Sequence, residues 1–213
     1  MRSEIDVSLR ADDLSPAARE VLLSARDEVD AMSRTVAGLL TLAAADDGIL
    51  GLRMQATELA SLAESMAATA ARLARRREAT IEHAGPPVTV RADGARLGHA
   101  VRNVLENAIE FSPHGGRVRV TTSPAGLRGR LVVEDDGPGI PQELRERVFD
   151  RFFRVDPSRS RATGGSGLGP AIAREIVEAH GGHVHAESSG RGSTFVLELP
   201  VDAGRQARSS PVP

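Results

Sequence analysis

The most regular pattern of apolar residues lies between residues 15 and 46. Ser15 followed by Pro16 is typical of a helix start, with serine as the cap and proline in the first turn. Apolar residues then recur in alternating steps of three and four, as in a coiled-coil seam. This pattern predicts one long helix that packs against other helices in a bundle, often in a dimer; the alternative is a helix whose seam faces the core of a monomer. The seam residues are Leu22, Ala25, Val29, Met32, Val36, Leu39 and Ala43.

The stretch "SEIDVSLRA" near the N-terminus predicts a short helix with Ile5 and Leu9 on one face. Together with the long helix it suggests a helical hairpin whose first arm is short. We therefore expect residues 1–48 to form a partial helical hairpin, ending at Asp46-Asp47-Gly48.

Residues 49–200 show a different pattern, in which helical and alternating segments follow one another. An alanine-rich helix is expected over about 56–77, another begins after its cap residue Asp93 and carries Asn103 and Asn107, and a third is expected over about 168–180. Strict alternation predicts strands within 79–84, 87–92, 116–123, 129–136, 182–188 and 192–200. This order predicts an α+β fold, a two-layer α/β sandwich with helices on one face of a mixed sheet. Residues 201–213 lack periodicity, and we expect a flexible tail.

Composition narrows the classes of function. The chain of 213 residues has a net charge of −2, only 2% aromatic residues and no cysteine, and all its basic residues are arginine. These features disfavour nucleic-acid binding, disulfides and thiol chemistry. No apolar run approaches the roughly 18 residues that a membrane span needs, and the N-terminus lacks the apolar stretch of a signal peptide. We expect a soluble cytoplasmic protein.

The helix "VRNVLENAIEFSP" carries two asparagines on one face. Asn103 and Asn107 lie one turn apart, so both amides point to the same side. Asparagine is a poor helix former, because its side chain competes for nearby backbone groups. A polar face exposed to water would explain the pair equally well, so this helix alone does not decide between a site and a surface.

Two glycine-containing stretches follow. In "EDDGPGI", Asp135 ends a predicted strand, where its carboxylate is well placed to accept a hydrogen bond from an amine, and Gly137 and Gly139 let a flat ligand approach closely. In "GGSGLGPAIA", Gly167 and Gly169 lead into a helix N-terminus, which favours an anion such as phosphate. A common turn and a flexible loop are the alternatives for these stretches. A Walker loop is excluded, because the chain has no lysine.

Together with "VFDRFFR", the asparagine helix and the two glycine-containing stretches resemble the ATP-binding domain of sensor histidine kinases. This domain belongs to the gyrase, Hsp90, histidine kinase and MutL superfamily. "NVLENA" resembles the N box, "DDGPGI" the first glycine box, "VFDRFFR" the F box and "GGSGLGPAIA" the second glycine box, in the family's order. "LLTLAAADDG" resembles the end of the second helix of the dimerisation and histidine-phosphotransfer domain. The resemblance covers about residues 2–200 and implies a Bergerat-type ATP-binding fold.

The resemblance also implies a role for individual residues. Asn107 would bind Mg²⁺ that bridges the ATP phosphates, and Asn103 would line the same site. Asp135 would accept from the adenine amine, and residues 150–166 would form a mobile lid. Positive charge would come from Arg151 and Arg154. The other residues expected to contact ATP are Gly137, Gly139, Ile140, Phe152, Gly165, Gly167, Leu168, Gly169 and Thr194.

Three features depart from the family's pattern. Glu110 stands where these kinases often carry a basic residue, so ATP affinity is expected to be low. Pro170 replaces a usual leucine, but it falls in the first turn of a helix, where proline is tolerated. The phosphoacceptor histidine, which the family follows with an acid, arginine and proline, has no counterpart among the six histidines. "HGGHVH" resembles the family's usual turn after the second glycine box rather than a metal site.

These features predict a truncated or split sensor histidine kinase that transfers the γ-phosphoryl group of ATP to a histidine on a partner polypeptide, for relay to a response regulator. Residues 15–46 would support a weak homodimer or heterodimer. Two other functions stay open. A gyrase- or MutL-type ATP hydrolase is disfavoured, because those enzymes place a glutamate at the position of Asn103. A non-enzymatic nucleotide-binding or dimerisation module is favoured by Glu110 and the missing histidine, and opposed by the intact glycine boxes.

Overall fold

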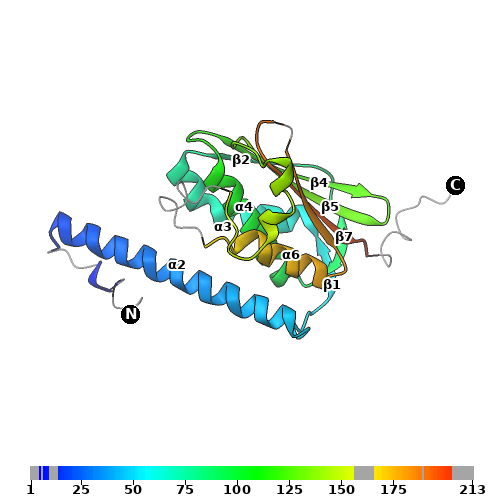
Figure 1. The fold of residues 1–213 in the computed structure, drawn as a ribbon, viewed down its shortest axis with the longest axis horizontal. Coiled ribbons are helices and arrows are strands. Elements are labelled where there is room, and N and C mark those ends of the chain that lie inside the picture. The colour runs from blue at the N-terminus through cyan, green and yellow to red at the C-terminus, as the bar shows by residue number, and fades with distance from the viewer. Residues whose placement is uncertain (1–4, 6, 10–13, 156–165, 189, 203–213) are drawn as a thin grey trace.

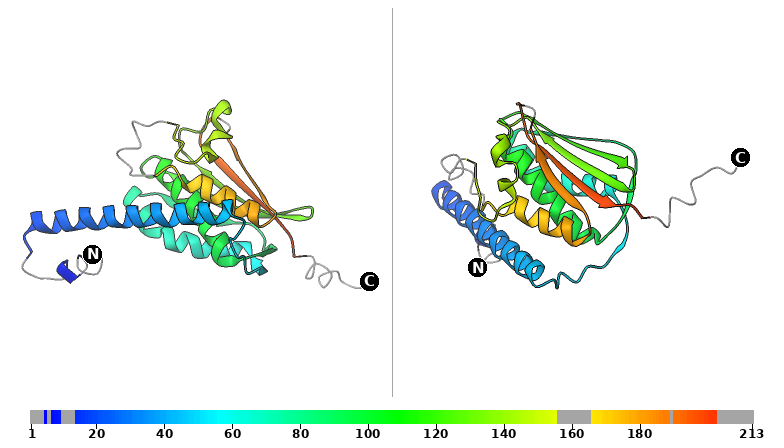
Figure 2. Two further views of the ribbon diagram at one scale, coloured as in Figure 1. Left: turned by 60° about the horizontal axis from the view of Figure 1, so that its bottom comes forward. Right: turned by 45° about the vertical axis from the view of Figure 1, so that its right-hand side comes forward.

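The computed structural model describes residues 5, 7–9, 14–155, 166–188 and 190–202. Its first long element is α2 (Pro16–Asp46), which Ser15 caps by accepting a hydrogen bond from the Ala18 N–H, as predicted. The N-terminal half of α2 projects beyond the rest of the fold (Figures 1 and 2). Of the short helix expected before it, only residues 5 and 7–9 are described; there the Leu9 N–H donates to the Ile5 carbonyl.

A mixed sheet of five strands forms one layer of the remaining fold. The strand order is β2-β4-β5-β7-β6, with β2 parallel to β4 and every other pair antiparallel. The strands are β2 (Thr80–Ala84), β4 (Arg117–Ala125), β5 (Arg128–Asp135), β6 (His183–Glu187) and β7 (Thr194–Pro200). Their pairing confirms the alternating segments as strands of a mixed sheet.

Three helices cover one face of this sheet (Figure 1). They are α3 (Leu59–Arg77), α4 (Gly94–Phe111) and α6 (Gly169–Ala179). The core lies between the two layers, because the buried faces of α4 and α6 pack against alternate residues of the central strands, such as Leu131 and Val133. Ion pairs such as Arg130–Glu198 lie on the sheet and are only partly buried. The predicted two-layer α+β sandwich is therefore confirmed.

The expected helix over 56–77 is wrong at its start. Residues 55–58 form strand β1 (Gln55–Glu58), which pairs antiparallel with β3 (Thr89–Ala92), and α3 begins only at Leu59. The Glu58 carboxylate caps α3 by accepting from the backbone N–H groups of Ala60 and Ser61. Pairing with β3, more than 30 residues away in the sequence, thus overrides the local helical pattern.

The seam of α2 does not face the core. Met32, Val36 and Leu39 are 60%, 56% and 42% exposed, whereas Leu42 on another face of the helix is buried in the hydrophobic core. The interpretation of the seam as the core face of a monomer is therefore wrong for this structure. Instead, α2 contacts α6 with one face and leaves its heptad seam open.

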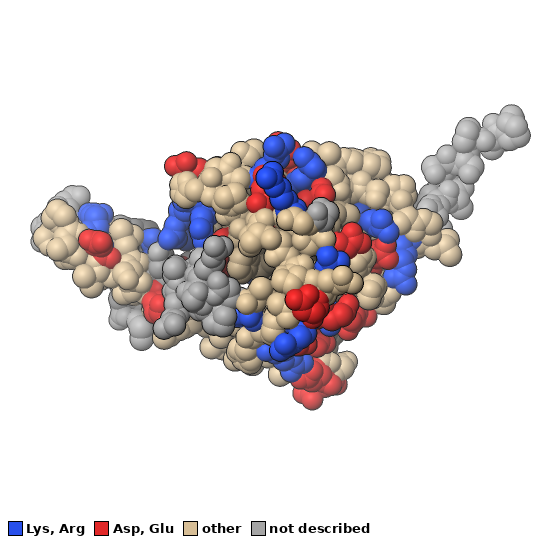
Figure 3. All heavy atoms as spheres, turned by 45° about the horizontal axis from the view of Figure 1, so that its top comes forward, with Lys and Arg blue, Asp and Glu red and all other residues tan. Residues whose placement is uncertain are grey.

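No helix within the described residues is long and apolar enough to cross a bilayer. On the face shown in Figure 3, acidic and basic side chains are interspersed, and neither sign covers the whole face.

Residues 201 and 202, which we expected in the tail, still bond to β3. Val201 forms a bridge with Val90, and the Asp202 N–H donates to the Thr89 carbonyl.

Candidate functional site

The site begins at the last residue of β5. Leu131, Val133 and Asp135 alternate on the buried side of this strand, so the carboxylate of Asp135 continues the face that points at the helices. Its Oδ1 accepts hydrogen bonds from the Gly137 N–H at 2.8 Å and the Ser193 N–H at 3.2 Å. Its Oδ2 is buried and has no hydrogen-bond partner among the described residues. The site therefore contains an acceptor atom, Oδ2 of Asp135, that is held in place and can accept a hydrogen bond from a ligand.

Burial also affects the charge of this group. Asp135 is 6% exposed, and burial raises its pKa, while the N–H groups of Gly137 and Ser193 act in the opposite direction. The neighbouring carboxylate of Asp136 raises the pKa further. A buried acceptor without a partner costs folding free energy, so its presence points to a ligand that supplies a donor.

The backbone around Asp135 has no room for side chains. A Cβ at Gly137 would lie 2.5 Å from the Asp135 Oδ1, and a Cβ at Gly192 would overlap the Asp135 carbonyl oxygen. Gly139 has a φ of +80°, and a Cβ there would lie 2.5 Å from the Ser188 hydroxyl. Glycine is therefore required where two loops close around the carboxylate, and the predicted Gly137 and Gly139 belong to this enclosure.

Asn103 and Asn107 are both half-buried on α4, and Asn103 lies next to the N-terminus of α6. The position of a Cβ at Gly169 would be 3.8 Å from the Asn103 side chain, so the predicted N box and second glycine box adjoin. The Asn103 amide donates to the His99 carbonyl, one turn earlier. The Asn107 amide makes no hydrogen bond within the described part of the chain, which leaves its oxygen available.

The start of α6 fits an anion. Leu168 is the N-cap residue, and no side chain caps the helix, so its first N–H groups keep their capacity to donate. Gly167 has a φ of +69°, and its carbonyl accepts from the Phe152 N–H at 3.0 Å. This bond ties the F box to the second glycine turn. Pro170 lies in the first turn of α6, as expected.

The remaining residues that were predicted to contact ATP differ in how far they are buried and in whether the structure describes them. Thr194 is half-buried at the start of β7, directly after Ser193, and Ile140 is buried just after the first glycine turn. The ring of Phe152 is 58% exposed, so only its backbone contributes to the turn. Arg154 is half-buried, and Gly165 lies outside the described residues, as does most of the expected lid.

Arg151 points to a different place from the one expected. Its guanidinium donates to both carboxylate oxygens of Asp46, at the end of α2, and also contacts Glu175 on α6 at 3.3 Å. In this structure the side chain is therefore held by two acids rather than directed at the glycine turns.

Sequence reasoning missed several residues that shape the site. Ser193 and Gly192 hold Asp135, and the glycine before a strand in "GRGST" was the available signal. His180 is 3% exposed and joins two helices: its Nε2 accepts from the Asp93 N–H, and its Nδ1 donates to the Ile176 carbonyl. Asp93 in turn caps α4, as predicted. This joint fixes the asparagine helix relative to α6, and no sequence pattern indicated it.

The residues present fit a nucleotide. An adenine amine would supply the donor that Oδ2 of Asp135 lacks, and the uncapped N-terminus of α6 suits phosphate. Within the described residues no group of three or more His, Cys, Asp or Glu side chains converges on a metal site. A divalent cation would therefore depend on the phosphates and on the neutral oxygen of Asn107, which is the kind of ligand that Mg²⁺ accepts.

Comparison with known proteins agrees with this geometry. Residues 92–203 match the family model of histidine kinase-, DNA gyrase B- and HSP90-like ATPases. Sensor protein IrlS of Burkholderia pseudomallei is 33% identical over 202 residues, which cover 94% of this chain and 43% of IrlS. The chain thus spans less than half the length of this relative.

Two solved structures are similar. Mycobacterial sensor histidine kinase MprB has 35% sequence identity and a TM-score of 0.60, over 70% of this chain and 97% of that one. Full-length ShkA, solved in complex with AMPPNP, has 28% identity and a TM-score of 0.75, over 91% of this chain and 41% of ShkA. The chain belongs to the family of histidine kinase-, DNA gyrase B- and HSP90-like ATPases, and it is homologous to the ATP-binding region of two-component sensor histidine kinases.

Proposed function

We propose that this chain is the ATP-binding catalytic part of a two-component sensor kinase and transfers phosphate to a histidine on a partner polypeptide. Residues 49–200 would carry catalysis, and residues 1–48 would contribute a partial dimerisation hairpin. The reaction forms a bond between an imidazole nitrogen and the γ-phosphorus while the bond to the β,γ-bridging oxygen breaks, so ADP leaves. The phosphate would pass to an aspartate of a response regulator in the cytoplasm.

The buried Oδ2 of Asp135 carries this proposal. It lies between two glycine turns and has no partner, although a buried acceptor without one costs roughly 1–3 kcal/mol. The adenine amine would supply the missing donor. Asn107 would hold Mg²⁺, and the α6 N-terminus would receive phosphate. Phosphoryl transfer needs chiefly such positioning and neutralisation of charge.

The partner in trans is inferred from the histidines and from α2. None of the six histidines lies on α2, so no side chain of this helix offers an acceptor. The exposed seam around Met32, Val36 and Leu39 is an apolar stripe at coiled-coil spacing. A helix that bears the acceptor histidine would cover this stripe.

Labelled ATP tests the proposal. The chain alone should acquire no acid-labile, base-stable phosphate, because phosphoryl transfer needs an acceptor in line and a misplacement of an ångström can cost about a hundredfold. Adding a separate polypeptide with a hairpin helix and its histidine should put the label on that partner. Label on the chain alone would contradict transfer in trans.

A second function is favoured by Glu110. This half-buried residue at the end of α4 stands where the family often carries a basic residue near the phosphates. A nucleotide-binding or dimerisation module without catalysis would tolerate a negative charge there. That function predicts nucleotide binding without label on any partner, and the same experiment therefore separates the two.

A further inference from the structure

Helix α2 docks on α6 through a face that carries Gly38. A Cβ at Gly38 would lie 2.7 Å from the Cδ1 of Ile172, so glycine permits this close approach of the two helices. Thr41 and Leu42, on the same side of α2, are 7% and 1% exposed. The contact extends to Leu168, the N-cap residue of α6, whose Cδ1 would lie 3.7 Å from the same Cβ at Gly38.

An ion pair fastens the end of the docked helix. The Arg151 guanidinium donates to Asp46 at 2.8 Å through Nη1 and also through Nη2, and Nη2 lies 3.3 Å from Glu175. These hydrogen bonds hold the pKa of Asp46 below its usual value, so the carboxylate is ionised at neutral pH. One arginine thus joins the end of α2 to the middle of α6.

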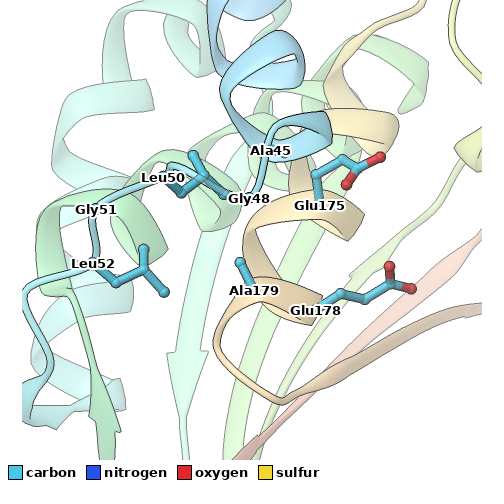
Figure 4. A pocket seen from close by; sticks show the side chains of 8 residues that line it. All are labelled: Ala45, Gly48, Leu50, Gly51, Leu52, Glu175, Glu178 and Ala179. Atoms are coloured by element: carbon cyan, nitrogen blue, oxygen red, sulfur yellow. The ribbon is translucent and has the colours of Figure 1, made fainter.

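The docked end of α2 is not tightly packed. A cavity of about 480 Å³ lies beside the ion pair, where the end of α2, the following linker and α6 meet (Figure 4). Because both acids and Arg151 remain substantially exposed, water competes with the ion pair. The ion pair is therefore weak enough for Arg151 to leave these carboxylates and bind another anion. The cavity is lined by Ala45, Gly48, Leu50, Gly51, Leu52, Glu175, Glu178 and Ala179.

Arg151 is also attached to the nucleotide site. The next residue, Phe152, donates its N–H to the Gly167 carbonyl in the second glycine turn. That turn leads into the uncapped start of α6, beside Asn103. Arginine binds phosphate with the same two-pronged geometry that it uses on a carboxylate. The same guanidinium therefore has two competing uses.

We infer that Asp46 and the nucleotide phosphates compete for Arg151, so that docking of α2 and binding of ATP oppose each other. The inference rests on the proposed function, since it assumes that ATP binds at this site. By linkage the opposition is reciprocal: ATP loosens the end of α2 by the same factor by which the docked helix weakens ATP binding. The chain would then report nucleotide occupancy through the position of α2.

Asp46→Asn tests this competition, with Asp47→Asn as its control. Both replacements remove one negative charge at the end of α2, but Asp47 makes no bond to Arg151. Isothermal titration with ATP should show about two- to fivefold tighter binding for Asp46→Asn, the range typical of one exposed ion pair. Adenosine, which has no phosphate, should bind all three proteins equally.

A distance measurement provides a second readout. The chain has no cysteine, so labels placed by Val21→Cys and Leu127→Cys, both at exposed positions, report the position of α2 alone. ATP should broaden the distance distribution in the otherwise unchanged chain, and Asp46→Asn should broaden it without ATP.

The outcomes separate the two proposals. ATP binding that is equal in Asp46→Asn and Asp47→Asn, with unchanged distances, would overturn the competition and leave the proposed function intact. If none of the proteins binds ATP or adenosine, the proposed function fails and the competition fails with it. A gain that appears equally with adenosine would also overturn the role of phosphate.

Discussion

Replacing Asp135 with asparagine separates two effects of one buried carboxylate. Oδ1 is fixed by the N–H groups of Gly137 and Ser193, and Oδ2 has no partner. Asparagine keeps the shape but puts an NH₂ donor in place of one oxygen. The amide oxygen must still accept from the two backbone groups, so the side chain cannot turn round without losing both bonds. The new donor therefore faces the site.

The effect on ATP binding follows from this orientation. The adenine amine would meet a donor instead of an ionised acceptor. Loss of one charge-assisted hydrogen bond costs about 1.5–3 kcal/mol, which weakens binding roughly 10- to 150-fold. We expect this loss to exceed that of any other single isosteric change in the site.

The effect on the free protein has the opposite sign. Burial raises the pKa of Asp135, so the ionised form opposes folding at neutral pH. For a raised pKa, the group's favourable contribution is fully present below the unfolded value of about 4 and is lost as the pH rises through the folded value. The asparagine variant should therefore be at least as stable as the wild type at pH 7. Its advantage should shrink as the pH is lowered toward 4.

Calorimetric titration and thermal unfolding measure the two effects, with Asp136→Asn as the control. Asp136 is exposed, and its Oδ2 accepts from the Arg117 N–H at 3.0 Å, so this variant makes the same change of charge beside the site. Equal ATP affinities for the two variants would refute the role of Asp135. A loss of affinity together with a large loss of stability would show that the substitution acts through misfolding.

Two further predictions concern the metal and the oligomeric state. Asn107→Ala should lose the enhancement of ADP affinity by Mg²⁺ and keep the affinity measured with a chelator; retention of the full enhancement would remove Asn107 from the metal site. Sedimentation should show mostly monomer at low micromolar protein, because a four-helix dimer needs two complete hairpins and the described residues offer one long arm. A tight dimer would instead show that α2 pairs through its open seam by itself.

The sequence predicted those elements best in which the spacing of apolar residues matches the spacing of the buried positions. Alternation placed β5 with its inner face, and Asp135 simply continues that face beyond Val133. The one-turn spacing of Asn103 and Asn107 correctly put both asparagines on one side of α4. Such elements are specified locally, because their apolar faces must be buried whatever their neighbours are.

The sequence failed where contacts between distant segments decide. Strand β1 exists because β3 offers it a partner, and its four residues show no strand pattern of their own. The joint between His180 and Asp93 spans 87 positions, and Arg151 is drawn to an acid 105 positions away. A single polar side chain carries no periodicity, so its partner cannot be predicted from local pattern.

The two faces of α2 show how a heptad pattern can be correct and still mislead. Met32 and Val36 lie about 120° to 160° around the helix from Gly38, which faces Ile172 of α6. The conspicuous seam is therefore open, and the face that docks combines Gly38 and Thr41 with Leu42, a set that the heptad pattern does not single out. Because the faces are nearly opposite, α2 can pair with another helix while it is docked. If ATP weakens the docking of α2 on α6 at one face, the resulting movement of α2 would also shift any helix that is packed on its other face.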